Sequence, residues 1–398
     1  MASQRPVIIA GAGIAGLTAA LALSKRGLPT LVLEQAGRLE EIGAGIQLSP
    51  NAARVLIDLG LRDRLEMRAI VPDAIRVMAG RTARQIVRIP LGKNIEQHYG
   101  APYWTMHRGE LQTVLLQAAE ADQNIVLRLG ARFEDFAKDK GGVAVRSRTG
   151  SQIADEHGVA LIGADGLWSR VRDRLRRERP PRFRHRTAWR ALLPSHHAAA
   201  QWQEPVIHLW LGQDAHLVHY PVKGGALINM VAIVRDEWRA ESWSAPGDPA
   251  EILRHFARWA WSEKARALIA APERWQKWAL HDRRGGVPTG SGAVTLIGDA
   301  AHPMLPFLAQ GAGMAIEDTA VLADTLANNL DNPRKALRAY ERERRARTAL
   351  AQKASRRQGR IYGLSGPEAL IRNLVIRAMG GERLLERYDW LYKWQPPS

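Results

Sequence analysis

The chain has 398 residues, of which 46% are apolar, so it can bury a large core and is not expected to be disordered. It contains no cysteine, which excludes disulfides, thiolate metal sites and cysteine nucleophiles and suits a reducing compartment such as the cytoplasm. The formal net charge of +17 favours anionic ligands. Nucleic acid and a membrane surface are therefore possible partners, and the motifs must decide between them and a small anionic ligand.

The first element in chain order is an uncharged stretch over residues 7–23. A secretory signal would need a small-residue cleavage site, and a membrane span would need about 20 apolar residues. The stretch has no clear cleavage site, stops short and carries glycines in its first half. A nucleotide-binding unit explains more of it, because residues 6–10 predict a buried strand, 17–25 a helix and 30–34 a second buried strand.

The turn between the first strand and the helix fits the pattern G-x-G-x-x-G. Gly11 permits the tight turn, Gly13 lets a pyrophosphate approach the backbone, and Gly16 lets the helix pack closely on the strand. The helix start then offers free N–H groups to the phosphates. Glu34 ends the second strand and is placed to accept hydrogen bonds from a ribose. The motif predicts a dinucleotide site but does not distinguish NAD from FAD.

The middle of the chain shows alternating helical and extended patterns without an internal repeat. Ser49 and Pro50 are suited to cap and begin a helix. The elements predicted here are a flexible loop at Gly43 and Gly45, a helix over 50–59, extended segments with turns over 71–99, a helix opening at 107–111 and ending near 121, strands over 125–162 and 183–235, and one helix over 249–270 whose apolar face includes Trp259.

Two later segments carry polar residues directly after a buried strand. Asp165 begins a turn, and Ser169 is suited to cap the helix that follows. Asp299 stands at the carboxyl end of another strand, where ligands bind in open α/β sheets. Gly311 then opens a long helix, whose N-terminus would stabilise the negative charge that the N1–C2=O edge of a flavin gains on reduction. His302 is predicted to hold the geometry of the intervening loop.

With these motifs in this order, the chain resembles the single-component FAD-dependent aromatic hydroxylases, the family of salicylate hydroxylase, 3-hydroxybenzoate 6-hydroxylase and 6-hydroxynicotinate 3-monooxygenase. The resemblance covers nearly the whole chain. It rests on GAGIAG with Glu34, GIQLSPNA (45–52), MHRGELQ (106–112), GADGLWSRVR (163–172) and GDAAHPMLPFLAQGAGMAIED (298–318).

The resemblance implies FAD as the cofactor and NADH or NADPH with O2 as co-substrates. The reaction it implies is hydroxylation of a small aromatic acid through a flavin C4a-hydroperoxide, with a hydroxybenzoate or hydroxypyridine carboxylate as substrate. Asp165 would serve both FAD and NAD(P)H, and no second G-x-G-x-x-G appears. The predicted cofactor-binding residues are Gly11, Gly13, Ile14, Ala15, Gly16, Glu34, Gln35, Gln47, Arg108, Asp165, Asp299, Pro306, Gly311 and Ala312.

A general base near the substrate hydroxyl would make an aromatic ring more reactive toward the activated oxygen. On a strand over 215–221, His216 and Tyr220 share one face and His219 points the other way. His216 and Tyr220 are therefore the predicted catalytic pair, and the H-x-x-x-Y pattern is similar to that of the family. Tyr103 and Pro306 complete the predicted substrate pocket. No metal site is predicted, because the histidines at 208, 216 and 219 have no carboxylate at ligand spacing.

We expect an α/β protein in three parts. A Rossmann-like FAD-binding domain would comprise 1–70, 100–180 and 280–330, a mostly antiparallel β-sheet substrate domain 71–99 and 181–279, and C-terminal helices 331–398. The chain would be a monomer or a homodimer.

Three alternatives stay open at this point. One is a relative acting on a larger, non-acidic aromatic or polyketide ring, and another is a NAD-dependent dehydrogenase without flavin. The third, a protein that binds nucleic acid or a membrane surface, is disfavoured because no recognised nucleic-acid module and no integral membrane segment accompany the basic clusters over 172–190 and 334–360. The second cluster is predicted to form a solvated, salt-bridged helix face.

Overall fold

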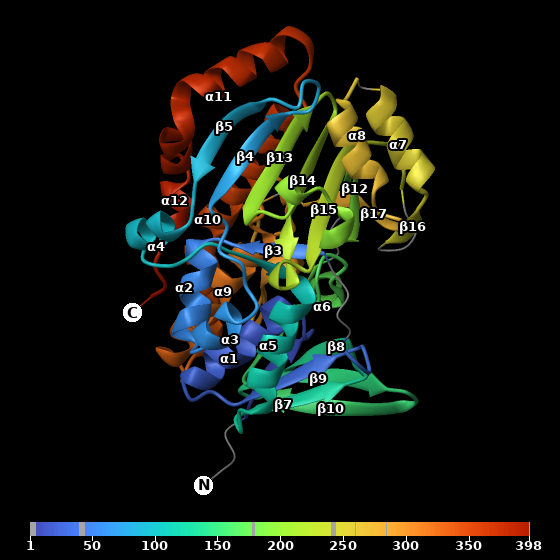
Figure 1. The fold of residues 1–398 in the computed structure, drawn as a ribbon. Coiled ribbons are helices and arrows are strands. Elements are labelled where there is room, and N and C mark those ends of the chain that lie inside the picture. The colour runs from blue at the N-terminus through green and yellow to red at the C-terminus, as the bar shows by residue number, and fades with distance from the viewer. Residues whose placement is uncertain are drawn as a thin grey trace.

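The fold contains a five-stranded parallel sheet, an eight-stranded sheet and smaller sheets of three and two strands (Figure 1). The computed structural model describes residues 5–39, 44–176, 180–239, 244–258, 260–283 and 285–397. The predictions made for Gly43 and Trp259 lie outside these residues. The mixed α/β class, the Rossmann-like sheet and the C-terminal helices confirm the predicted fold class.

The parallel sheet has the strand order β18-β11-β1-β2-β7, and every neighbouring pair runs parallel. The carboxyl ends of parallel strands meet at one edge of a sheet, so the segments after β1, β11 and β18 come together there. These strands are β1 (Val7–Ala10), β2 (Thr30–Glu34), β7 (Ile125–Leu129), β11 (Ala160–Gly163) and β18 (Val294–Leu296).

Both faces of the parallel sheet are covered. Val7 and Ile9 pack toward the helices α1 (Ile14–Lys25), α5 (Arg108–Glu120) and α9 (Gly311–Ala327). Ile8 and Ala10 pack toward a three-stranded antiparallel sheet made of β8 (Ala131–Asp139), β9 (Gly142–Thr149) and β10 (Gln152–Gly158). Burial on both faces explains why these strands are continuous apolar runs in the sequence.

The eight-stranded sheet has the order β16-β17-β12-β15-β14-β13-β4-β5 and is antiparallel except where β13 pairs with β4. Its outer face packs against α7 (Pro249–Arg258) and α8 (Glu263–Ala270) in a core rich in tryptophan, with Trp189, Trp210 and Trp275. The strands are β4 (Ala74–Ala79), β5 (Gln85–Pro90), β12 (Arg182–Pro194), β13 (Val206–Gly212), β14 (Ala215–Val222), β15 (Leu227–Arg235), β16 (Ala245–Gly247) and β17 (Trp275–Asp282).

Three local predictions were wrong. The predicted helix over 249–270 is two helices, since Ser262 accepts a hydrogen bond from Ala265 N and starts α8 anew. Residues 93–99 form helix α4 (Lys93–Tyr99) rather than an extended segment, and Gly100 ends it at a left-handed φ of 74°. Gly45, predicted to lie in a flexible loop, begins strand β3 (Gly45–Leu48). Ser49 and Pro50 do start α2 (Pro50–Asp58) as predicted, with Ser49 as the N-cap residue, but the Ser49 side chain makes no capping hydrogen bond.

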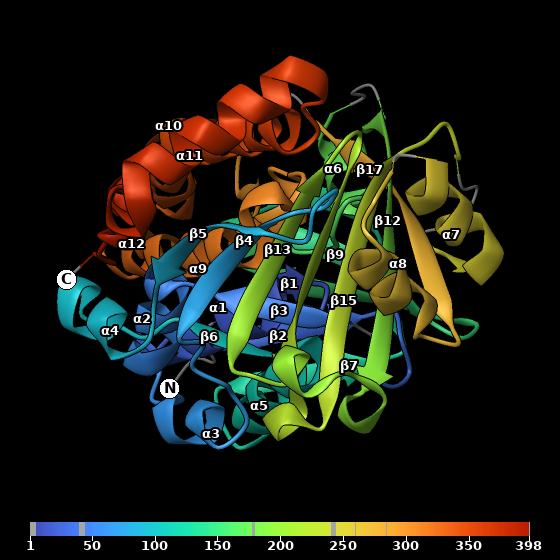
Figure 2. The ribbon, with the colours of Figure 1, turned by 45° about the horizontal axis from the view of Figure 1, so that its top comes forward.

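The remaining elements connect the sheets and extend the chain across them. The C-terminal helices are α10 (Pro333–Tyr362), α11 (Gly366–Glu386) and α12 (Asp389–Tyr392). α10 packs on α9, and α11 packs along β5, so both lie toward the β5 edge of the eight-stranded sheet while α7 and α8 lie toward the other (Figure 2). The connecting elements are α3 (Arg62–Glu66), α6 (Arg170–Leu175) and the two-stranded sheet of β3 (Gly45–Leu48) and β6 (Trp104–His107).

A buried ionic network joins α9 to α10. Arg344 donates to the Asp318 carboxylate over 2.7 Å and to the Glu317 carboxylate over 2.7 Å, and Arg347 donates to Glu317 over 2.6 Å. Glu341 is also buried and accepts from the Thr295 hydroxyl. The prediction of a solvated face on this helix was therefore wrong at Glu341 and Arg344, because the arginine-rich run folds inward against carboxylates of α9.

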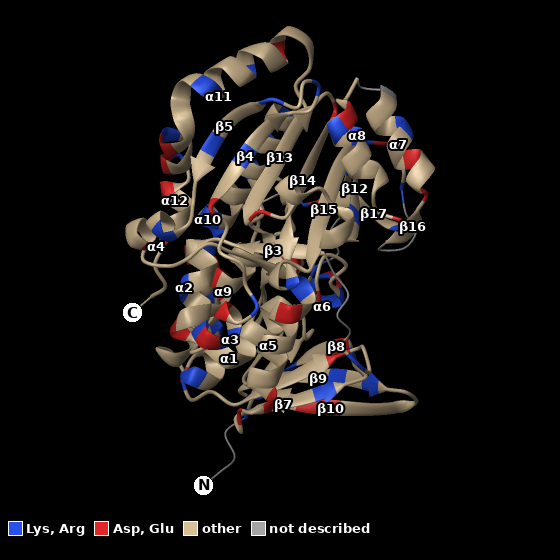
Figure 3. Ribbon diagram, in the orientation of Figure 1, with Lys and Arg blue, Asp and Glu red and all other residues tan. Residues whose placement is uncertain are grey.

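In Figure 3, Lys and Arg positions lie on the eight-stranded sheet, on the sheet of β8, β9 and β10 and on the helices, with Asp and Glu positions among them. Within the described residues, no helix is both long enough and apolar enough to cross a membrane. The division into three domains stays a prediction, although the eight-stranded sheet draws its strands only from residues 74–90 and 182–282.

Replacing Arg344 should destabilise the fold strongly. Arg344→Gln leaves two buried carboxylates short of a cation, which typically costs about 3–5 kcal/mol, so we expect a large drop in the thermal midpoint of unfolding. Arg342→Gln on the exposed side of the same helix should change stability by no more than about 0.5 kcal/mol. Equal midpoints for the two variants would show that the network is not needed for stability.

Candidate functional site

A cavity of about 350 Å³ lies where the carboxyl edge of the parallel sheet meets the inner face of the eight-stranded sheet. The glycine turn near the N-terminus and the loop after β18 both line this cavity. Strands β12, β14 and β15, which belong to the predicted substrate domain, line it as well. The predicted site residues that line it are Gly13, Ile14, Ala15, Gln47, Arg108, His216, Tyr220, Asp299, Pro306, Gly311 and Ala312.

The glycine-rich turn after β1 is shaped for a ligand rather than for side chains. Gly11 has a φ of +107°, and a Cβ there would lie 2.6 Å from the carbonyl oxygen of Ala164. A Cβ on Gly16 would lie 1.8 Å from the carbonyl oxygen of Gly11, so the helix and the turn touch directly. A Cβ on Gly13 would meet no described atom within 4 Å and would project into the cavity. The turn therefore leaves room at Gly13, where the motif predicts a pyrophosphate.

Glu34 organises the same turn. Its carboxylate accepts hydrogen bonds from the Ala12 and Ala36 amides over 2.7 Å and 2.8 Å. A second, smaller cavity of about 80 Å³ is lined by Gly11, Glu34, Gln35 and Asp165. Gly13, Ala164 and Gly166, one or two residues along the chain from Gly11 and Asp165, line the larger cavity, so the two cavities adjoin along these turns.

The Asp165 turn is tied to the Asp299 loop. The Asp165 carboxylate accepts from the Ser169 hydroxyl over 2.5 Å and from the Val171 amide, and burial raises its pKa. Ser169 accepts from the Arg172 amide, which confirms its predicted role as a helix cap. The buried Arg172 guanidinium donates to the carbonyl oxygens of residues 300 and 301. One arginine therefore fixes the spacing of the two acidic loops.

Hydrogen bonds to Asp318 of α9 fix the loop after β18. His302 Nε2 lies 2.5 Å from an Asp318 oxygen that also accepts from the Gly298 amide. Burial would raise the pKa of Asp318, but His302, Arg344 and these hydrogen bonds lower it below its ordinary value. His302 is buried and lines neither of the two large cavities at this site. Its position agrees with the predicted role in loop geometry.

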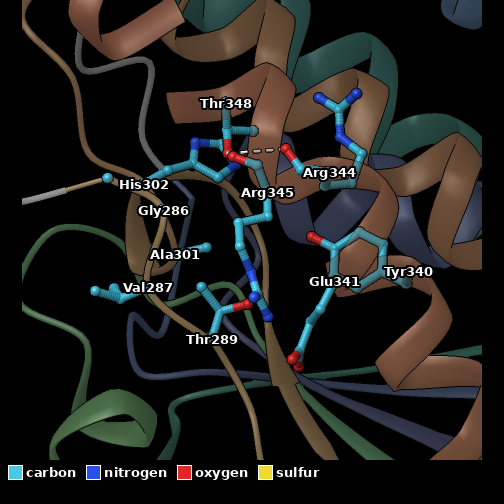
Figure 4. A pocket seen from close by; sticks show the side chains of 11 residues that line it. Gly286, Val287, Thr289, Ala301, His302, Tyr340, Glu341, Arg344, Arg345 and Thr348 are labelled. Atoms are coloured by element: carbon cyan, nitrogen blue, oxygen red, sulfur yellow. Dashed lines mark hydrogen bonds between the residues drawn. The ribbon is translucent and has the colours of Figure 1, made fainter. Parts of the chain in front are cut away.

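Figure 4 shows the surroundings of His302 on the α10 side, with Thr348 and Arg344 labelled nearby. The cavity there has a volume of only about 20 Å³. A space of that size holds about one water molecule and no cofactor. The α10 side of the loop is therefore packed against protein. The opposite side, where Asp299 lines the large cavity, is the side that can contact a ligand.

Gln310, the residue before α9, was not predicted as a site residue, yet it ties the start of that helix to the segment around Ser49. The side chain is buried, donates to the Ser49 hydroxyl over 2.7 Å and accepts from the Asn51 amide group over 3.1 Å. Ser49 thus serves α9 instead of capping α2. Gly311 and Ala312 follow directly and line the cavity, where the first N–H groups of a helix have no intrahelical partner.

An inner pocket of about 150 Å³ adjoins the large cavity and shares Gln47, His216, Val218 and Pro306 with it. Apart from Gln358, the rest of its lining is aliphatic and aromatic, with no Lys, Arg, Asp or Glu among the described residues that form it. The aromatic lining residues are Tyr103, Phe307, Tyr362, Tyr388 and Tyr392.

Strand β14 places the two predicted catalytic residues as its pleat requires. His216 and Tyr220 both face the cavity, whereas His219 packs on the opposite face and accepts from the Trp210 indole N–H over 3.1 Å. The Tyr103 hydroxyl donates to Gln47 Oε1 over 2.7 Å. Burial raises the pKa of the Tyr220 hydroxyl, and its hydrogen bond with Gln47 opposes the shift.

His216 is a buried neutral imidazole. Its ring contacts Phe307 and Tyr362 at centroid distances of 5.3 Å and 5.1 Å. Burial, with a smaller effect of the nearby Arg186 cation, lowers the pKa of His216 to about 3. The imidazole is therefore unprotonated at neutral pH.

Sequence reasoning missed the contribution of distant segments to the site. Arg190 of β12 lines the large cavity beside Tyr220, and its guanidinium lies over the Trp278 ring at 4.9 Å. Burial and then Arg108 lower the pKa of Arg190 to about 10. The C-terminal helices supply Gln358 and three tyrosines to the inner pocket. No local motif marks these residues, because tertiary packing alone brings them here.

The parallel sheet with its glycine turn, the acidic residue that ends β2 and the helix start beyond Asp299 together define a dinucleotide-binding α/β fold. The FAD-binding domain family matches residues 4–355, and the chain belongs to that family. It is a flavin-dependent monooxygenase of the aromatic hydroxylase type. A NAD-dependent dehydrogenase without flavin is thereby excluded.

Similar proteins share this chain over almost its full length. A 3-hydroxybenzoate 6-hydroxylase of Polaromonas naphthalenivorans (strain CJ2) is 38% identical, covering 98% of this chain and 96% of the relative. A 3-amino-4-hydroxybenzoate 2-monooxygenase of Streptomyces platensis is 38% identical over 99% of this chain and 98% of its own. A solved salicylate hydroxylase substrate complex has a TM-score of 0.82 at 26% identity, covering 99% and 97% of the two chains.

Two glycine substitutions should separate cofactor binding from folding. Gly13→Ala should fold with unchanged thermal stability but bind FAD at least about tenfold more weakly, because the methyl group enters the cavity and not the protein. Gly16→Ala should lose stability as well, since its methyl group collides with the Gly11 carbonyl. The measurements are FAD titration of apoprotein and thermal unfolding, and Gly37→Ala is the control. Tight FAD binding by Gly13→Ala would contradict this account of the turn.

Proposed function

We propose that this monooxygenase hydroxylates a single-ring hydroxy-aromatic acid, of the hydroxybenzoate or hydroxypyridine carboxylate type, with NADH or NADPH and O2. The observation that carries the proposal is the inner pocket beside the flavin cavity, with His216 between them. A cavity of about 150 Å³ is known to accommodate one benzene ring. That size favours a single ring over a polyketide, and the relatives named above act on substituted benzoates.

The residues present fit FAD. The open space at Gly13, the acid at the end of β2 and the second cavity beside Gln35 suit its ADP half. Asp299 and the start of α9 suit the ribityl chain and the ring system. When FAD is bound and reduced, it supplies the activated oxygen that an electron-rich ring attacks.

His216 is the proposed general base. The neutral imidazole lies on the wall common to the two cavities and makes no hydrogen bond to another described side chain, so it is available to a substrate hydroxyl. Taking that proton raises the electron density of the ring at the moment it reacts. Tyr220 and Gln47 form a hydrogen-bonded unit with Tyr103, and we assign them the positioning of the substrate.

NAD(P)H would approach near Asp165, in the cytoplasm. Arg182, Arg184 and Arg186 of the first basic cluster are candidates to attract its phosphates, but the Arg184 guanidinium already donates over 2.5 Å to the buried Asp282. Arg186 lies over the Phe307 ring. Arg182 is exposed and is the remaining member of that group available to a nicotinamide cofactor.

Removing the base should reduce coupled product formation and leave FAD in place. His216→Ala should lower the rate of hydroxylation by about 100-fold at neutral pH. The loss should shrink as the pH rises toward about 10, where a phenol ionises without help. The wild-type rate should not fall from His216 protonation between pH 8 and pH 6, since burial lowers that pKa to about 3.

Val218→Ala is the matched control, because it removes volume from the same face of β14 but no proton acceptor. Product analysis alongside NAD(P)H consumption separates hydroxylation from peroxide release. If His216→Ala and Val218→Ala show the same loss and neither recovers at high pH, His216 is not the base.

A screen of aromatic acids tests the substrate class. We expect a hydroxybenzoate or hydroxypyridine carboxylate to stimulate NAD(P)H oxidation with stoichiometric hydroxylated product. The corresponding carboxamides should be much poorer substrates. If neutral multi-ring compounds are turned over and the acids are not, the proposed substrate class is wrong.

A further inference from the structure

We propose that an outer groove between α10 and α11 is the capture site and access route for the aromatic carboxylate substrate. The groove has a volume of about 440 Å³ and is open at the protein surface. The inference rests on the proposed function, because it takes the anionic aromatic acid as the occupant.

The groove adjoins the inner pocket. The two share Leu308, Gln358, Ile376, Leu384 and Tyr388 as lining residues. The inner pocket in turn shares His216 and Pro306 with the flavin cavity. A line of cavities therefore runs from the surface at α10 and α11 to the proposed base.

The charge of this route changes along its length. Lys353, Arg357 and Arg387 line the outer groove, all three are exposed, and no Asp or Glu is among the described residues that line it. None of the three forms an ion pair with a described residue. The inner pocket carries no charged side chain in the described lining. The cations of this route thus lie in the outer groove at one end and, as Arg108 and Arg190, in the flavin cavity beyond the inner pocket at the other.

The groove also matches the ring of the substrate. Leu350, Ile361, Ile376 and Trp390 provide an apolar floor beside the cations. An anion steered by unpaired cations gains in association rate, and the gain falls with salt because the charges are exposed. An aromatic carboxylate can place its ring on the floor and its charge at the rim, and then move inward past Gln358.

The first test measures association directly on the holoenzyme. Stopped-flow quenching of flavin fluorescence gives the association rate of the acid found in the substrate screen, without turnover. For the triple variant Lys353→Gln, Arg357→Gln and Arg387→Gln we expect a decrease of about tenfold at low salt. We also expect a flatter salt dependence, an unchanged kcat and an unchanged association rate for the carboxamide. Arg342→Gln, exposed on α10 but outside the groove, is the charge control.

The second test blocks the route. The chain has no cysteine, so a single introduced thiol can be labelled alone. Ala354→Cys, in the groove, modified with a bulky methanethiosulfonate, should lose substrate association and regain it when the label is reduced off. Leu330→Cys, exposed and outside the groove, should be insensitive to the same label.

The outcomes keep this inference apart from the proposed function. If the wild type uses the acid but the triple variant and the labelled Ala354→Cys protein bind it at the wild-type rate, the acid enters elsewhere and the access route is wrong. If the wild type prefers the carboxamide, the proposed substrate class fails, and a groove built to capture a carboxylate fails with it.

Discussion

The carboxylate of Asp318 is the constraint on which the cofactor side of the molecule depends. It is buried in α9 and accepts from the Gly298 amide, from His302 and from Arg344 of α10. One anion thus joins the end of β18, the loop that carries Asp299 and two helices. A buried charge that loses its partners costs several kcal/mol of folding free energy, roughly 3–5. The groups bonded to Asp318 are therefore held together as one unit. The start of α9 therefore faces the cavity at a fixed distance from the strand that precedes it.

A second constraint joins the cofactor side to the eight-stranded sheet. The Gly45 amide donates to Asn229 of β15 over 2.6 Å. A Cβ on Gly45 would lie 2.7 Å from the Tyr220 ring, so only glycine allows this approach. The same strand that meets Gly45 through Tyr220 presents His216 to the inner pocket. Backbone contact between the two parts thus sets the position of the proposed base relative to the cofactor cavity.

The sequence predicted most reliably what a local pattern determines. The glycine turn, the strand that alternates His216 with His219, and the cap at Ser169 all follow from spacing and side-chain chemistry within a few residues. It failed where long-range packing decides: Ser49 bonds to a side chain some 260 residues away, and the charged run of α10 is drawn into the core by carboxylates of α9. Three tyrosines of the inner pocket share this cause, since Tyr362 comes from α10 and Tyr388 and Tyr392 from the start and end of α12, far along the chain from the sheet strands that they meet.

The distribution of charge along the route has a consequence for His216. The imidazole is buried, and Arg186 adds to the lowering of its pKa. A cation inside the pocket would lower it further and weaken the base. A neutral inner pocket avoids that further lowering. In the proposed scheme the exposed cations of the outer groove attract the acid, so its capture needs no additional cation beside His216.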